Sequence, residues 1–119
     1  MSYRDLDAYK VCQELTLAIH KVCDALQDRD PQMAAQLWQA ALTATSRIAR
    51  ASAFSSRPRF AYSLNSSLAA LSQIEYCLNL CDGFGLVDRN TCKQLEGLRG
   101  RANFYVTKLI FSGIGPPPS

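Results

Sequence analysis

The sequence has few helix-breaking residues and few side chains suited to acid–base chemistry. Its 119 residues contain one histidine, one tryptophan and no glycine before Gly83. No apolar run approaches the roughly 18 residues needed to cross a bilayer. The charged start, MSYRDLDAYK, lacks the apolar segment of a signal peptide. We therefore expect a cytoplasmic protein that does not associate with a membrane.

The motifs of common enzyme classes are also missing. The chain has no P-loop, no GxGxxG, no HExxH, no GxSxG and no ExxH pair of the carboxylate-bridged iron bundles. His20 is the only histidine, which leaves little for general acid–base catalysis. We therefore predict a protein that is not an enzyme, with no catalytic residue and no cofactor.

The cysteines do not form a recognised metal-binding pattern. Their number is odd and no export signal precedes them, so we expect reduced thiols used as small apolar core residues. A metal site would have to use Cys77 and Cys81, four residues apart, with His20, and that is no known zinc spacing. We predict no metal. The five cysteines are Cys12, Cys23, Cys77, Cys81 and Cys92.

Proline and glycine divide the chain into four segments with helical periodicity. The breaks fall at Pro31, at Pro58 and at the pair Gly83 and Gly85. Apolar residues recur at spacings of three and four within each segment, and no segment alternates with period two. The spacing predicts four helices, at about residues 6–26, 32–53, 58–81 and 88–111.

Four amphipathic helices with short loops favour an all-α fold, an antiparallel up-down-up-down four-helix bundle over residues 1–112. Ser56 and Asp88 are the expected N-caps of the last two helices. Gly83 or Gly85 is expected to take the left-handed conformation that ends the third helix. Residues 113–119, GIGPPPS, are predicted to form a disordered Gly/Pro tail.

The helices carry more apolar surface than one bundle needs. Segment 32–53 has a second row of Trp38, Leu42, Thr45 and Ala49, and its many small residues would let another helix approach closely. Single exposed apolar side chains are normal, but aligned rows with aromatic residues are typical of interfaces. We predict a homo-oligomer whose interface includes Trp38, Leu42, Leu17, Tyr62, Tyr76, Phe104 and Phe111.

Positive charge is concentrated in the middle of the sequence. No acidic residue occurs between Asp30 and Glu75, and Gln36, Gln39 and Thr43 share the side of the second helix that carries its arginines. Arginine suits bidentate contacts to phosphate or carboxylate. The pattern predicts an anion or nucleic-acid surface, or else a solvated face balanced by acids on neighbouring helices. The candidate nucleic-acid-binding residues are Arg47, Arg50, Arg57 and Arg59.

Glu75 falls within the apolar row of the third segment, between Leu71 and Leu78. A carboxylate buried there must be paired, hydrogen-bonded or protonated. We predict a buried structural charge, satisfied by an Arg or Tyr from another helix. A catalytic role would need a second titrating group beside it, and His20 is the only candidate base in the sequence.

The chain resembles a bacterial four-helix-bundle family named for proteins encoded in 23S ribosomal RNA intervening sequences. The opening YRDLDAYKVCQELTLAIH is similar to the start of that family, and two further stretches follow its second-helix and third-helix patterns. In QLWQAALTATSRIARAS the matching positions are Gln36, Leu37, Ala40, Ile48 and Ala49. In FAYSLNSSLAALSQIEYCLNL they are Phe60, Leu64, Ser67, Leu71, Glu75 and Leu78.

The resemblance implies an antiparallel four-helix bundle that assembles in the cytosol as a ring-like homopentamer without known catalytic activity. A related branch, the accessory proteins of diversity-generating retroelements, binds nucleic acid and associates with a reverse transcriptase. The implied partners are therefore further copies of the chain, and RNA, DNA or a nucleic-acid enzyme. The alternative is a protein–protein interaction scaffold that binds no nucleic acid.

Two departures from the family pattern involve the arginines. Arg47 stands where the pattern has Asn, and Arg50 stands where it has Glu. Any role of the replaced residues does not carry over to this chain. Arg47 and Arg50 are expected to face either solvent with a bound anion or a neighbouring subunit.

Overall fold

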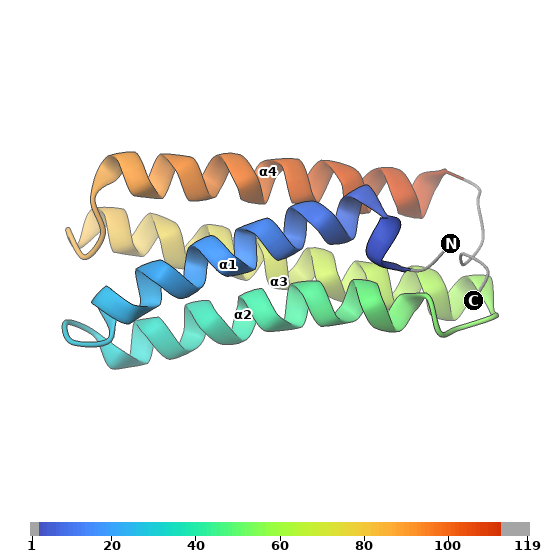
Figure 1. The fold of residues 1–119 in the computed structure, drawn as a ribbon, viewed down its shortest axis with the longest axis horizontal. Helices are drawn as coiled ribbons and strands as arrows, with labels where there is room; N and C mark the ends of the chain where they lie inside the picture. The colour runs from blue at the N-terminus through green and yellow to red at the C-terminus, as the bar shows by residue number, and fades with distance from the viewer. Residues whose placement is uncertain (1–2, 113–119) are drawn as a thin grey trace.

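Four long helices make up almost all of the structure, a computed structural model that describes residues 3–112. A short 3-10 helix, η1 (Tyr3–Asp5), precedes α1 (Asp7–Leu26), α2 (Pro31–Ala51), α3 (Arg57–Gly83) and α4 (Arg89–Phe111) (Figure 1). No strand occurs in the described residues. The predicted all-α four-helix bundle is confirmed, whereas the predicted tail at 113–119 lies outside the described residues.

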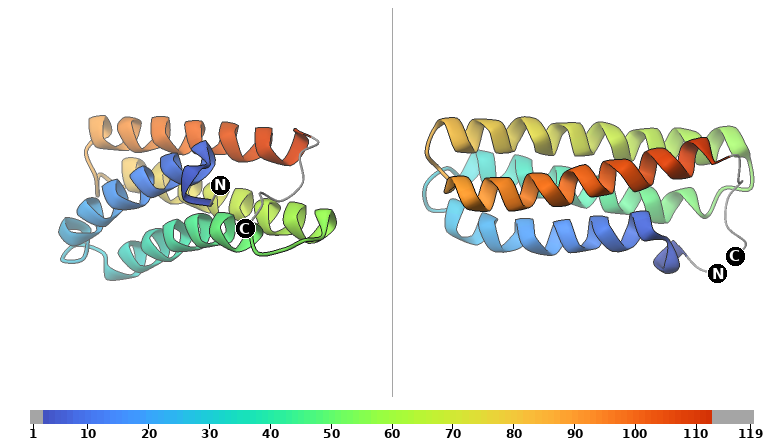
Figure 2. Two further views of the ribbon diagram at one scale, coloured as in Figure 1. Left: turned by 45° about the vertical axis from the view of Figure 1, so that its right-hand side comes forward. Right: turned by 90° about the horizontal axis from the view of Figure 1, so that it is seen from above.

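Each helix packs against two neighbours: α2 and α4 both contact α1 and α3. The bundle is 43 Å long and 20 Å across in the other two directions. The start of α1, the α2–α3 loop and the end of α4 lie at one end, and the other two loops lie at the opposite end (Figures 1 and 2). Segments that are far apart in the sequence therefore share an end of the bundle.

Side-chain caps and prolines fix where three helices begin. Asp30 accepts a hydrogen bond from the N–H of Met33 at 3.0 Å, and Pro31 follows as the first residue of α2. Ser56 and Asp88 cap α3 and α4, as expected. Hydrogen bonds from the side chain and N–H of Thr91 lower the pKa of Asp88, because they stabilise its charged form.

The end of α3 is a Schellman motif built on glycine. Gly85 has φ +67°, the left-handed conformation expected for one of the two glycines, and Gly83 remains helical. The N–H of Leu86 donates to the carbonyl of Cys81 at 2.9 Å, and the N–H of Gly85 donates to Asp82 at 3.1 Å. These bonds satisfy carbonyls that the end of the helix would leave without partners.

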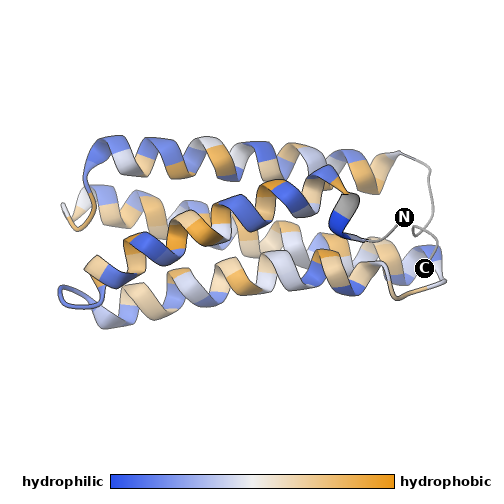
Figure 3. Cartoon of the chain, viewed as in Figure 1, coloured by the Kyte–Doolittle hydropathy of each residue, from blue (hydrophilic) through white to orange (hydrophobic). Residues whose placement is uncertain are grey.

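The core is formed by apolar rows that recur along each helix, and Figure 3 shows apolar bands alternating with hydrophilic ones. In α2, the expected row is buried throughout. In α3, Ile74 is fully buried between Leu71 and Leu78. The buried row of α2 is Leu37, Ala41, Ala44, Ile48 and Ala51.

The prediction that Glu75 is buried is wrong, because its side chain is 49% exposed. Ile74 occupies the core position, three residues after Leu71 and four before Leu78. Glu75 is turned about 100° from it and reaches Arg99 of α4, whose Nη2 donates to its carboxylate at 3.1 Å. The expected contact with an arginine from another helix is therefore present, but at the surface.

All five cysteines are buried free thiols. Burial raises the pKa of Cys12 to about 12 and that of Cys81 to about 11, so both thiols are protonated near neutral pH. Within residues 3–112, no group of three or more His, Cys, Asp or Glu side chains is placed to hold a metal ion. None of the described helices combines the length and apolarity required to span a membrane.

Candidate nucleic-acid interface

The stretch without acidic residues folds as a helical hairpin. All residues between Asp30 and Glu75 belong to α2, to the α2–α3 loop or to the first two-thirds of α3. α2 and α3 pack side by side, so their shared outer face carries no carboxylate over this interval. One continuous surface of the bundle therefore lacks negative charge.

Small residues bring α2 and α3 together. Ser67, which is fully buried, donates to the carbonyl of Ala44 at 2.7 Å, and Ser63 donates to the carbonyl of Arg47 at 2.8 Å. Short side chains allow helix backbones to approach closely. The small residues of α2, which were expected to admit another helix, are thus used within the chain by α3.

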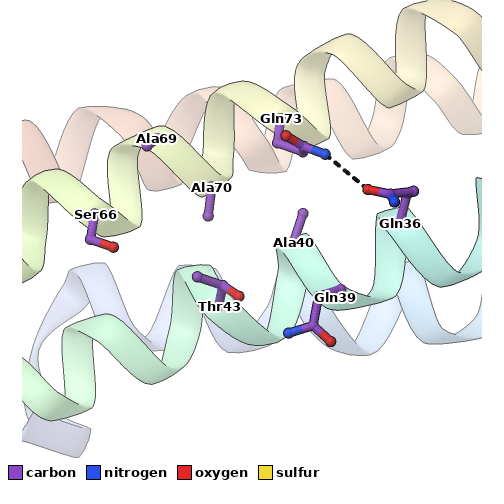
Figure 4. Close-up of a pocket in the computed structure, with 8 residues that line it drawn as sticks. All are labelled: Gln36, Gln39, Ala40, Thr43, Ser66, Ala69, Ala70 and Gln73. Carbon is purple, nitrogen blue, oxygen red and sulfur yellow. Dashed lines mark hydrogen bonds between the residues drawn. The ribbon is translucent and has the colours of Figure 1, made fainter.

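An open groove runs along the outer face between α2 and α3, with a volume of about 300 Å³ (Figure 4). Gln73 of α3 donates to Gln36 of α2 across it, with Nε2 and Oε1 3.1 Å apart. Every lining side chain is uncharged, so the groove offers hydrogen-bonding groups and no formal charge. Its lining residues are Gln36, Gln39, Ala40, Thr43, Ser66, Ala69, Ala70 and Gln73.

The four candidate arginines lie together at one end of this hairpin. Arg47 and Arg50 occupy the last two turns of α2, and Arg57 and Arg59 occupy the first turn of α3. Arg50 and Arg59 are exposed, whereas the other two are partly buried. Over the described part of the chain, Arg47, Arg50 and Arg59 form no ion pair with a carboxylate.

Arg57 has a structural contact that the sequence did not indicate. Its guanidinium donates to the carbonyl of Ile110 in the last turn of α4, and it lies 5.5 Å from the ring centroid of Phe60. This contact joins the start of α3 to the end of α4. The Nε of Arg47 is buried and has no hydrogen-bond partner within residues 3–112. Arg50 and Arg59 are therefore the most accessible of the four.

Charge is unequal between the two halves of the bundle when each helix is divided at its midpoint. Counted over α1 to α4, the half with the α2–α3 loop has seven basic residues against two acidic ones, Asp7 and Glu14. The basic residues are Lys10, Arg47, Arg50, Arg57, Arg59, Arg101 and Lys108. In the opposite half the helices carry four of each sign, so the positive potential belongs to one end.

Most of the side chains predicted to form an oligomer interface are exposed in the single chain. Trp38 is an exception, since it is partly buried with its ring 5.1 Å from that of His20 on α1. The second row of α2 therefore packs partly on α1, where Thr45 and Thr16 also share a hydrogen bond of 2.7 Å. Those exposed are Leu17, Leu42, Tyr62, Tyr76, Phe104 and Phe111, and their interface role stays a prediction.

Sequence reasoning missed a second pocket, beside the arginines. Phe54, Pro58, Arg59 and Tyr62 line an open pocket of about 380 Å³ between the α2–α3 loop and the start of α3. The available signal was the local run FSSRPRFAY, in which aromatic residues lie on both sides of two arginines. The sequence patterns assigned Arg57 and Arg59 to an anion surface and Tyr62 to an oligomer interface, and did not place Arg59 and Tyr62 at one pocket.

Comparisons with known proteins give the family of the chain. Residues 4–102 match the family described as 23S rRNA-intervening sequence protein. The chain belongs to this family. The family resemblance seen in the sequence is thereby confirmed. No curated protein matches the chain.

A solved structure has the same fold as this chain. It is a protein of unknown function from the S23 ribosomal protein family of Bacteroides thetaiotaomicron, with a TM-score of 0.81 and 18% sequence identity. The similarity covers 87% of this chain and 98% of that one. At this identity the likeness shows the shared fold alone.

Proposed function

We propose that this protein is a non-catalytic cytosolic homo-oligomer, a pentamer as the family resemblance implies, that binds nucleic acid or a nucleoprotein. One observation carries the proposal. Arg47, Arg50 and Arg59 meet at one end of the bundle, on a surface without acids, and pair with no carboxylate of the described residues. An unneutralised group of arginines favours a polyanionic ligand.

The expected contacts are to phosphate and not to base edges. Phosphate contacts supply most of the sequence-independent affinity for nucleic acid, and arginine binds phosphate in a bidentate manner. No helix of the described chain presents a row of arginines long enough to read a groove. In a symmetric oligomer the arginine end would repeat, and several weak contacts to one polyanion would act together.

The side chains available for catalysis support a binding role. The only histidine, His20, is exposed, and its Nδ1 is 4.0 Å from the carboxylate of Asp24. Burial raises the pKa of all five cysteine thiols, which lowers their reactivity as nucleophiles. We therefore assign no reaction to the protein.

Salt-dependent binding of labelled RNA and DNA tests the proposal. A double variant, Arg50→Gln with Arg59→Gln, removes two exposed charges at the proposed site. A matched variant, Lys21→Gln with Lys93→Gln, removes two exposed charges from the opposite half of the bundle. Fluorescence anisotropy between about 50 and 200 mM salt gives the log–log slope, which is roughly 0.7 to 0.9 per phosphate contact.

The arginine variant should bind more weakly, with a slope reduced by roughly 1.4 to 1.8, while the lysine variant should remain close to wild type. The proposal fails if wild type binds neither RNA nor DNA at about 50 mM salt, where such contacts are strongest. It also fails if both variants weaken binding equally, because net charge and not the arginine end would then decide affinity.

Exposed apolar side chains favour a second candidate, a protein interaction scaffold that binds no nucleic acid. Leu17, Tyr62, Phe104 and Phe111 are each at least 60% exposed. Such side chains at several places are typical of surfaces that other proteins cover. In that case the arginines would meet acidic groups of a partner or neighbouring subunit, and the binding experiment would show no nucleic-acid affinity.

A further inference from the structure

The pocket beside the arginines is a second feature of the same end of the bundle. Its lining is mostly apolar, and its polar groups are the guanidinium of Arg59 and the hydroxyl of Tyr62. Pro58 and Tyr62 are four residues apart, so they share one face of α3. Phe54 closes the pocket from the α2–α3 loop, where its N–H donates to the carbonyl of Ala51 at 3.2 Å.

Tyr62 leaves most of its ring uncovered. Its exposed fraction is 79%, which is far above that of an aromatic residue used only for the core. Ser63, the next residue, is bonded to the backbone of Arg47, and Arg59 lies three residues before Tyr62. The exposed ring therefore shares its pocket with the guanidinium of Arg59, the backbone of Arg47 is bonded to the neighbouring residue, and no acid lies within the hairpin around it.

We propose that the pocket of Phe54, Pro58, Arg59 and Tyr62 stacks an unpaired base of a single-stranded nucleic acid, with Arg59 and Arg47 contacting the flanking phosphates. The inference rests on the proposed function and names its ligand class. An aromatic ring offers a stacking platform for any base, and adjacent basic groups track the backbone. Bases inside a duplex are already stacked and paired, so the pocket favours single strands.

A second exposed tyrosine on the same helix provides a matched control. Tyr76 is 64% exposed and lines another groove of α2 and α3. That groove contains Asp30 and no basic residue, and Glu75 precedes Tyr76 in the chain. A phosphate backbone is not expected to bind there, because the groove supplies a negative charge and no positive one. Comparing Tyr62→Ala with Tyr76→Ala therefore shows whether an effect on binding is specific to the pocket with Arg59 or follows from the loss of any exposed aromatic ring.

The test measures binding of three labelled oligonucleotides of equal length: a single strand, its duplex, and a single strand with abasic sites. Tyr62→Ala should weaken binding of the base-bearing single strand by about 5- to 100-fold, the range for loss of one stacked base. Duplex and abasic strands should bind this variant and wild type alike. Tyr62→Phe and Tyr76→Ala should both behave as wild type, because the first keeps the ring and the second leaves the site intact.

Three results would overturn the inference while leaving the proposed function standing. Tyr62→Ala could bind the single strand as well as wild type, or it could lose duplex and single strand equally. It could also change the mass measured by light scattering, which would mean that a second copy of the chain covers Tyr62. If wild type binds no oligonucleotide at about 50 mM salt, the proposed function fails and the inference fails with it.

Discussion

Arg99 joins two carboxylates from different helices at the side of the bundle. Its guanidinium contacts Glu75 of α3 at 3.1 Å and Glu96 of α4 at 2.6 Å. The pKa of Arg99 is raised, chiefly by its hydrogen bonds to Glu96, which favour the charged form. The Arg99 side chain is only 12% exposed, so its apolar stem also packs against the helices. Loss of this residue removes both packing and ion pairs.

We expect Arg99→Ala to lower the free energy of unfolding by about 1 to 2 kcal/mol. Glu75→Gln should lower it by less than about 0.5 kcal/mol, because an ion pair with a half-exposed carboxylate contributes little. Arg101→Ala serves as the control, since Arg101 is exposed on the same helix and forms no ion pair within residues 3–112. Urea denaturation followed by circular dichroism measures all three. Equal effects of Arg99→Ala and Arg101→Ala would show that the three-residue contact adds no stability.

At the scale of the elements, the contact between α2 and α3 depends on small side chains. Ala44 is 1% exposed, and its carbonyl accepts the hydrogen bond from the hydroxyl of Ser67. A larger side chain at either position would force the helices apart and separate this pair. Protein interiors are close-packed, so added carbon atoms are not absorbed without strain.

Ala44→Leu should therefore lower the free energy of unfolding by about 2 to 3 kcal/mol. Ala35→Leu is the matched control, because Ala35 lies on the exposed side of the same helix and leucine is nearly as good a helix former as alanine. The control should change stability by less than about 0.5 kcal/mol. Thermal or urea unfolding gives the comparison. If Ala44→Leu is as stable as Ala35→Leu, the space between α2 and α3 at Ala44 admits a larger side chain, and the contact does not depend on small residues.

At the scale of the whole molecule, we predict that exposed apolar side chains between α1 and α2 form a surface for self-association. Leu17 and Leu42 are both exposed. In the antiparallel pairing they fall between two contacts that join the helices, the Thr16–Thr45 hydrogen bond and the edge-to-face pair of His20 and Trp38. Trp38 belongs partly to the chain's own packing, so Leu42 is the better position for a test.

Leu42→Glu should reduce a homo-oligomer to the mass of one chain, 13.2 kDa, because a carboxylate within an apolar interface lacks a partner. Gln13→Glu adds the same charge at an exposed polar position of α1 and should leave the mass unchanged. Light scattering coupled to size exclusion measures both. A monomeric wild type would contradict the predicted oligomer, and an unchanged mass for Leu42→Glu would exclude this surface as its interface.

Local signals explain which features of the fold could be predicted. The breaks at Pro31, Pro58 and Gly85 and the caps Ser56 and Asp88 act within a few residues, so the sequence is sufficient to place them. The prediction for Glu75 failed for the opposite reason. Whether a residue faces the core depends on a rotation of roughly 100° per position, and the neighbouring helices select Ile74 for that place.

The sequence by itself determined the four helices, the fold class and the long interval without acids, because propensity, periodicity and composition are carried by short stretches. Only the tertiary structure decided where the residues of that interval lie relative to one another and to the other helices. Antiparallel packing brings the arginines of α2 and α3 to one end, with Lys108 of α4 at the same end. It also ties Arg57 at the start of α3 to Ile110 at the end of α4. Such contacts depend on how the helices rotate and pack against one another, which no local stretch encodes.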